Sequence, residues 1–175
     1  LDDEVTISKS TIALYEKHFG PEKHSFEHQG CLFVMINSML INSDLEEEKA
    51  QWDWLEETLR DFAGTRVFMF SHYPVYLSTT NEFDYYDNID EPGRSRMLDL
   101  LDRYGVEGFF GGHVHNFFYN HLGGTHHCTL PSTVIAKHEC RDGKDELVLP
   151  QTIVTRHDHL EFFRTMPSHD EGRLD

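Results

Sequence analysis

The chain has 175 residues, 38% of them hydrophobic and 13% aromatic, which is enough apolar material for one folded domain with a buried core. It carries 15 Lys and Arg against 31 Asp and Glu, a formal net charge of -16 with histidine neutral. A surface this acidic repels nucleic-acid backbones and anionic membranes, so we expect neither as a partner. No apolar run approaches the ~20 residues that span a bilayer, and no signal peptide is visible.

The numbers of cysteines and histidines lead to separate expectations about redox compartment and metal binding. The three cysteines, Cys31, Cys128 and Cys140, form neither a closed disulfide framework nor a Cys-x-x-Cys site, and this usage favours a reducing compartment such as the cytoplasm. Thirteen histidines, by contrast, are many for this length, and histidine is the commonest metal ligand. The composition therefore raises the expectation of a metal site without locating it.

The chain begins with a predicted helix and a predicted strand pair. Residues 10–20 (STIALYEKHFG) predict a short helix capped by Ser10 and ended by a glycine. Residues 23–29 alternate enough to predict a strand. The apolar run 31–37 (CLFVMIN) indicates a strand buried on both faces, and Gln29-Gly30 is expected to form the tight turn between the two strands.

The clearest predicted helix covers residues 45–64. Glutamates occupy its first turn, where the helix dipole favours them, and its apolar residues Trp52, Leu55 and Leu59 share one face. A third apolar strand, 66–70 (RVFMF), follows and runs directly into His72.

A long polar and aromatic stretch, 74–93, has no clean periodicity and is expected to be a functional loop or lid. A helix over 93–105 and a buried strand over 106–110 (VEGFF) come next, and residues 126–138 and 147–163 predict further strands. Alternating helices and buried strands predict an α/β layered fold with a largely parallel sheet.

Two of the predicted strands lead into histidines. His72 ends the strand 66–70, while His113 and His115 follow the strand 106–110 after two glycines. The carboxyl ends of parallel strands meet at one edge of a sheet, where ligands bind in such folds. We therefore expect these three imidazoles to meet around metal ions, although they could also be incidental to a buried strand end. An extended H-x-H segment points its side chains to opposite sides, whereas a turn lets them fan around a centre.

Two segments resemble the calcineurin-like metallophosphoesterases. The stretch FMFSHYPVY is similar to the strand and H-x-P segment of that family, and FFGGHVHNFFYN is similar to its G-H-x-H segment. Upstream, YEKHFGPEKHSFEHQGCLFVMINS and QWDWLEETL resemble the strand pair and the Trp-Leu helix of the family. The likeness spans roughly residues 10 to 135.

This resemblance implies a layered α/β/β/α sandwich, a metal-dependent phosphoric ester hydrolase and a dinuclear centre of two divalent ions, with Mn, Fe, Zn, Ni and Mg not distinguishable. His72 and His113 would match ligands of the second metal, and His115 a ligand of the first. The implied partner is a small phosphate-ester substrate. A metal-held hydroxide attacks phosphorus in this chemistry, while the cations neutralise the developing charge.

The family motifs D-x-H, G-D-x-x-D and G-N-H-[DE] are not found in the chain. They supply the carboxylate bridge and the general-acid histidine, so we assign no catalytic residue here. We expect residues 1–164 to be the carboxyl-terminal, partial phosphoesterase domain, followed by a polar tail over 165–175, and we expect the chain to be inactive alone. The alternative is a noncatalytic binding module on a degenerate phosphoesterase scaffold.

Four further residues are candidates for roles around the metals. Tyr73 follows His72 directly, and Tyr85 and Tyr86 lie in the acidic loop, so they are expected to contact substrate or simply to pack at the surface. Asn116 follows the second histidine of the H-x-H pair and is expected either to orient a histidine or to serve as a turn residue.

Overall fold

The computed structural model describes residues 7–132, 137–141 and 144–148, and the chain divides into two compact units, Leu1–Ile135 and Ala136–Asp175. In the second unit, strands β7 (Lys137–Arg141) and β8 (Lys144–Val148) pair as an antiparallel hairpin. The predicted boundary at residue 164 and the predicted tail lie outside the described residues. All the site residues discussed below belong to the first unit.

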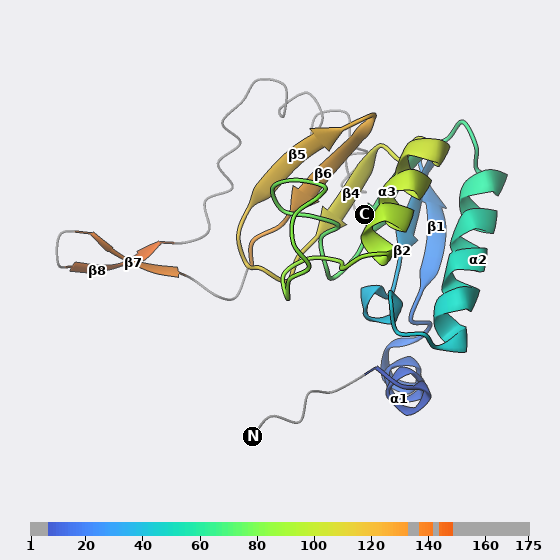
Figure 1. The fold of residues 1–175 in the computed structure, drawn as a ribbon, viewed down its shortest axis with the longest axis horizontal. Coiled ribbons are helices and arrows are strands. Elements are labelled where there is room, and N and C mark those ends of the chain that lie inside the picture. Colours follow the sequence, from blue (N-terminus) through green and yellow to red (C-terminus); the bar gives the residue numbers. More distant parts are fainter. Residues whose placement is uncertain (1–6, 133–136, 142–143, 149–175) are drawn as a thin grey trace, which may run out of the picture. The chain divides into compact units, whose positions relative to one another are not determined.

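A six-stranded sheet forms the centre of the first unit (Figure 1). In spatial order the strands are β1 (His24–His28), β2 (Cys31–Met35), β3 (Arg66–Phe70), β4 (Gly108–Gly111), β6 (Thr125–Thr129) and β5 (Phe118–Leu122). The strands β2, β3, β4 and β6 run parallel, and the two edge strands are antiparallel to their neighbours. The predicted α/β fold class with a largely parallel sheet is thereby confirmed.

Helices α2 (Glu46–Asp61) and α3 (Gly93–Tyr104) lie side by side along the sheet (Figure 1). Both helices contribute to one hydrophobic core, together with alternate residues of the central strands, because successive strand side chains point to opposite faces. The helical residues predicted to face inward are all buried: Trp52, Leu55, Leu59, Met97, Leu100 and Leu101.

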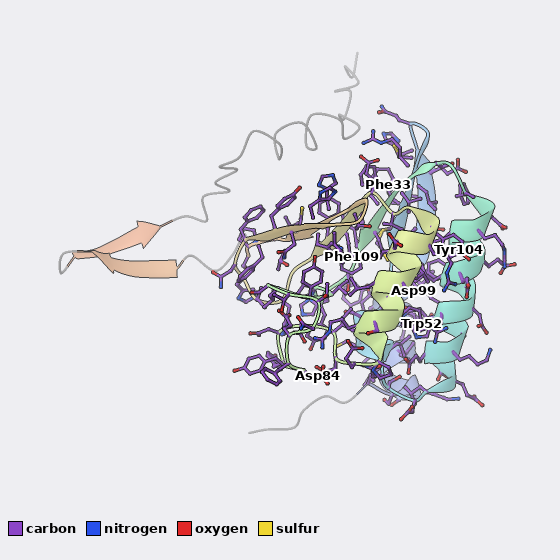
Figure 2. All side chains as sticks on the ribbon, turned by 45° about the horizontal axis from the view of Figure 1, so that its top comes forward. Phe33, Trp52, Asp84, Asp99, Tyr104 and Phe109 are labelled. Carbon is purple, nitrogen blue, oxygen red and sulfur yellow. The ribbon has the colours of Figure 1, made fainter. Side chains whose placement is uncertain are left out.

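The other face of the sheet carries aromatic side chains from four adjacent strands. Phe33 stacks on Phe26 with ring centroids 5.1 Å apart, and it contacts Phe68 at 5.6 Å. Further along, Phe70 stacks on Phe110 at 5.0 Å. Figure 2 labels Phe33 in the sheet and Trp52 of helix α2. The two faces therefore differ in chemistry, with mostly aliphatic strand side chains towards the helices and phenylalanines on the opposite side.

The amino-terminal elements differ slightly from the sequence prediction. Helix α1 (Lys9–Phe19) is capped by Ser8 and not by Ser10, because the Ser8 hydroxyl accepts from the Thr11 N–H in a capping box. The predicted turn at Gln29-Gly30 is confirmed, and both residues have positive φ, as a two-residue hairpin loop demands. A short 3-10 helix, η1 (Ser38–Leu40), follows β2.

The sequence prediction missed strand β5. Its residues pair with β6 across a turn at Gly123, which has φ 60°. The pattern of two short strands around Gly-Gly was a hairpin signal, but the polar side chains of β5 concealed it. In the described part of the chain, no helix has the length and apolar character needed to cross a membrane.

Candidate metal centre

The carboxyl ends of β3 and β4 lie next to each other at one edge of the sheet. Phe70 pairs with Phe110, and backbone bonding continues beyond the strands: the Ser71 N–H donates to the Phe110 carbonyl and the Gly112 N–H to the His72 carbonyl, each at 2.9 Å. Parallel pairing therefore brings His72 to the turn that follows β4. We call the two adjoining segments, 71–74 and 111–115, the histidine edge.

Gly111 lets the two turns of the histidine edge pack directly against each other. A Cβ atom at this position would lie 2.8 Å from the Pro74 Cα and 2.9 Å from the Pro74 nitrogen, both of which are backbone atoms that cannot rotate away. A Cβ at Gly112 would meet only the His72 carbonyl oxygen, at 3.7 Å. Gly111 is thus required because the backbone of Pro74 leaves no space for a side chain at this position. The sequence pattern alone did not reveal this.

Both histidines after the glycines adopt left-handed backbone conformations. The φ angle is 65° at His113 and 55° at His115, and the intervening Val114 N–H donates to the Gly112 carbonyl at 2.7 Å. The segment is therefore a turn and not an extended strand end. Non-glycine residues in this region cost about 1–3 kcal/mol each and concentrate at functional sites.

The rings of His72 and His113 face each other. Nε2 of His72 lies 3.0 Å from Nδ1 of His113, and Nε2 of His113 lies 3.0 Å from the Tyr86 carbonyl oxygen. A proton on Nε2 of His113 that is donated to that carbonyl leaves Nδ1 as a lone pair directed towards His72. Outer hydrogen bonds of this kind orient histidines that bind metals.

The paired nitrogens lie at hydrogen-bond distance from each other. With metal–nitrogen distances of about 2.1 Å, two ligands of a tetrahedral ion have nitrogens about 3.4 Å apart, so both rings would serve one ion after a small shift. Burial, and then the neighbouring His113 and His115, lower the pKa of His72 below its ordinary value of 6.5. His72 is therefore neutral at pH 7, the form of histidine that binds a metal.

His115 does not complete a cluster with the other two histidines. It lines a cavity of about 400 Å³ together with His113, Ser71 and the two glycines. Within the described ranges, no group of three or more His, Cys, Asp or Glu side chains is placed to hold a metal ion. Among the predicted ligands, the structure thus brings together His72 and His113, with His115 on the wall of an adjacent cavity.

The three predicted tyrosines surround this pair to different extents. The ring centroids of Tyr73 and Tyr86 lie 4.4 Å and 4.6 Å from that of His113. Tyr85 lines a cavity together with both of them. Tyr85 and Tyr86 are 68% and 76% exposed, so they are available to a ligand.

Asn116 has a clear structural role in the turn. Its side-chain N–H donates to the Val114 carbonyl at 3.2 Å, between the two left-handed histidines. Sequence reasoning missed two other contributors, Ser38 and the Tyr86 carbonyl. The Ser38 hydroxyl accepts from the Tyr73 N–H at 3.1 Å, and a backbone carbonyl that orients a histidine has no sequence signature at all.

Comparison with known proteins gives one solved structure with a similar fold and several curated relatives by sequence. Among solved structures, the anchor protein GAP50 of the inner membrane complex of Plasmodium aligns with a TM-score of 0.50 and 17% identity, over 66% of this chain and 38% of that one. At this identity the likeness bears on the fold alone. The two histidine segments resemble those of the calcineurin-like metallophosphoesterases, and the curated relatives of the chain agree with that resemblance.

Its curated relatives include one phosphatase from several vertebrates. The chain is 32% identical to the serine/threonine-protein phosphatase CPPED1 of Bos taurus over 152 residues, which cover 83% of this chain and 47% of the relative. The Homo sapiens protein of the same name is 29% identical over 86% of this chain and 48% of its own length. The chain thus spans about half the length of the curated relatives it matches, and no family model matches it.

Proposed function

We propose that this chain supplies histidine ligands to the divalent metal centre of a phosphoester hydrolase. The observation that carries the proposal is the approach of His72 Nε2 to His113 Nδ1 at 3.0 Å, on a turn held in left-handed conformations. The phosphatase names of the curated relatives support the reaction class. A small phosphate ester is the proposed substrate.

His72 and His113 are proposed to share one ion, and His115 to serve the other ion of a dinuclear centre. The contact between the rings of His72 and His113 supports this division, because it brings those two nitrogens within 3.0 Å of each other. Bound divalent ions would polarise the phosphoryl oxygens and activate a water molecule. The chain itself holds His72 in its neutral form and fixes the His113 ring through the Tyr86 carbonyl.

We further propose that the chain is inactive alone. The carboxylate bridge and the general acid that this chemistry needs have no counterpart beside the histidines within the described residues, where no cluster of three ligands is found. The same observation favours a second candidate, a noncatalytic binding module on the phosphoesterase scaffold. The two differ in whether His72 and His113 still bind a metal.

Calorimetric titration of the chain with Mn²⁺ and Zn²⁺ tests the proposal. The wild-type chain should bind either ion, and replacing His113 by Ala should weaken binding by at least about tenfold, since a ligand is lost. His24→Ala, on the exposed edge strand β1, is the matched control. Equal affinity in all three proteins would favour the binding module. In the complete protein, His113→Ala should lower the turnover of p-nitrophenyl phosphate by orders of magnitude.

A further inference from the structure

A second cavity opens on the other side of the tyrosines that contact His113. It has a volume of about 280 Å³ and lies between the 81–90 loop and the segment after β2. We call it the tyrosine pocket. Its lining includes Tyr73, Tyr85, Tyr86, Asn88 and Asp90.

The lining of the tyrosine pocket has the character of a site for an organic cation. Three aromatic rings contribute to it, and aromatic faces attract ammonium groups. Asp90 adds a carboxylate, and none of the described residues that line the cavity is basic. The surrounding loop adds the acidic residues Glu82 and Asp87, whereas its Asp84 and Glu91 are paired with Arg94. A neutral or anionic group gains nothing from this field, whereas a cation does.

Asn88 adds an unmet hydrogen-bond acceptor to the lining. Its side chain is 7% exposed, and its amide N–H groups donate to the Glu82 carboxylate at 2.6 Å and the Phe83 carbonyl at 3.3 Å. The amide oxygen is buried and has no partner among the described residues. Buried acceptors are costly when unpaired, so this atom favours a ligand that brings an N–H donor.

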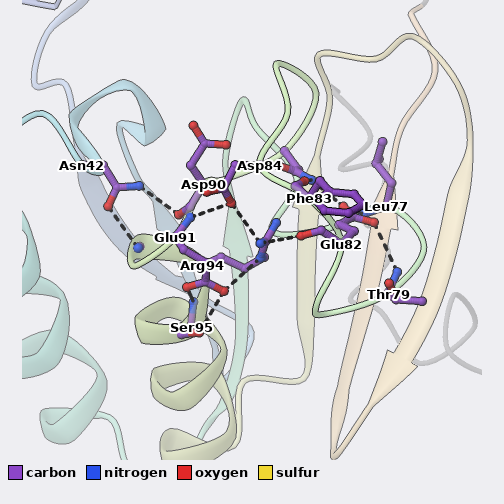
Figure 3. A network of polar contacts seen from close by, with 12 residues as sticks. Asn42, Leu77, Thr79, Glu82, Phe83, Asp84, Asp90, Glu91, Arg94 and Ser95 are labelled. Carbon is purple, nitrogen blue, oxygen red and sulfur yellow. Dashed lines mark hydrogen bonds and ion pairs between the residues drawn. The ribbon is translucent and has the colours of Figure 1, made fainter.

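The loop that carries the pocket is fixed in place by buried polar contacts (Figure 3). The guanidinium of Arg94, 2% exposed, donates to the Glu82 carbonyl at 2.7 Å and to the carboxylates of Asp84 and Glu91 at 3.0 and 3.2 Å. The Glu82 carboxylate accepts the backbone N–H groups of residues 77–79. These contacts fix the backbone of the loop on both sides of Tyr85 and Tyr86, which lowers the entropy cost of binding a ligand there.

The tyrosine pocket and the histidine edge share their walls. The rings of Tyr73 and Tyr86 line the pocket on one side and lie within 4.6 Å of the His113 ring on the other. An ester whose phosphate lies at His113 would therefore have its alcohol portion beside the tyrosines that line the pocket.

We infer that the tyrosine pocket binds an alkylammonium group carried by the alcohol portion of the phosphoester substrate. This inference rests on the proposed function for the position of the phosphate, but the pocket itself is defined by its own residues. The ammonium head lies against Tyr85 and Tyr86, and an N–H of a primary ammonium meets the Asn88 amide oxygen.

Binding to the whole chain can be measured without metal or turnover. In an NMR titration, ethanolamine and choline should shift the backbone amide signals of residues 85–90 and bind in the millimolar range. Their uncharged counterpart, 3,3-dimethylbutan-1-ol, should bind roughly fivefold more weakly or not at all. Equal binding of the neutral alcohol, or no binding of either cation, would overturn the inference.

Variants separate an aromatic cation site from a merely apolar one. Tyr86→Leu should weaken choline binding at least roughly fivefold, whereas Tyr86→Phe should retain it, because the ring and not the hydroxyl attracts the cation. Tyr15→Leu, on helix α1, is the matched control. If Tyr86→Leu binds choline as wild type does, while circular dichroism shows both proteins folded, the pocket is not the site.

A further variant distinguishes this inference from the proposed function. Tyr85 lines the pocket, and among the described residues the tyrosine rings in contact with His113 are those of Tyr73 and Tyr86, so Tyr85→Leu should weaken choline binding and leave Mn²⁺ affinity unchanged. Loss of choline binding with intact metal binding supports the pocket alone. Vesicles of phosphatidylcholine, compared with soluble phosphocholine, then show whether the ammonium belongs to a lipid headgroup or to a free ester.

Discussion

The helix-covered face of the sheet and the histidine edge use the same strands in contrasting ways. On the helix-covered face, β3 contributes Val67 and Met69 to an apolar core in which both are almost completely buried. At the histidine edge, two residues take left-handed backbone angles and two imidazoles face each other without a counter-charge in hydrogen-bond contact. The first arrangement stabilises the fold, and the second uses some of that stability to hold a site.

This comparison predicts which substitutions should affect stability and which should affect metal binding. Changes on the helix-covered face should lower the free energy of unfolding and leave metal binding to the folded protein intact. Changes at the histidine edge should weaken metal binding and leave the free energy of unfolding nearly unchanged. Gly111 is an exception, because a side chain there would collide with the backbone of Pro74. The four predictions below run from the largest expected change in stability to the smallest.

Leu55→Ala should cause the largest loss. Leu55 is fully buried between α2 and the sheet, so its truncation leaves a cavity and should cost about 3–5 kcal/mol of unfolding free energy. Urea denaturation followed by circular dichroism measures the loss. Leu14→Ala on α1, where the side chain is 58% exposed, serves as the control and should change stability little. A loss below about 1 kcal/mol at Leu55 would show that the core is not packed as described.

His127 should make stability depend on pH. Burial, with smaller contributions from His121 and His126, lowers its pKa from 6.5 to about 4. The unfolded chain therefore takes up this proton at higher pH than the folded protein does. Stability is fully present above pH 6.5 and decreases as the pH falls towards 4, by about 3 kcal/mol at most.

Other groups also titrate in this range. The test therefore compares the pH dependence of the unfolding free energy between two proteins. Urea denaturation of wild type and His127→Phe between pH 7 and pH 4 isolates the contribution of the imidazole. The wild type should lose more stability on acidification than the variant does. Parallel pH curves would mean that His127 becomes charged in the folded state as readily as in the unfolded chain.

Gly111→Ala should destabilise the protein by about 1–3 kcal/mol, because the added methyl group meets the backbone of Pro74 at 2.8 Å. Gly112→Ala is the matched control, since its nearest contact is an ordinary 3.7 Å. Thermal denaturation of the two variants should separate them clearly. The same melting temperature in both would contradict the close approach of the two turns.

His113→Asn should have the smallest effect on stability and the largest on the proposed site. Asparagine tolerates the left-handed conformation that this position requires, so the unfolding free energy should change by less than about 0.5 kcal/mol. Metal affinity should nevertheless decrease at least about tenfold, since the ring nitrogen that faces His72 is lost. A variant that retains full affinity while folded would remove His113 from the proposed ligand set.

Much of the fold followed from local patterns in the chain. The spacing of Trp52, Leu55 and Leu59 predicted the buried face of α2, and the run 31–37 predicted a central strand. Strand β5 was missed because its exposure pattern depends on which neighbour it pairs with, and that partner lies beyond the Gly123 turn. The cap at Ser8 was misplaced by two residues, since several hydroxyl residues surround the helix start.

The sequence alone determined that histidines follow two buried strands, and the motifs around them indicated the family that the comparisons support. Only the tertiary structure decided that His72 and His113 face each other, that Gly111 must lack a side chain and that three tyrosines share one pocket. The physical reason is that strand periodicity is a local property of the chain. Contacts between turns depend instead on the register of β3 against β4, which arises only when the sheet assembles.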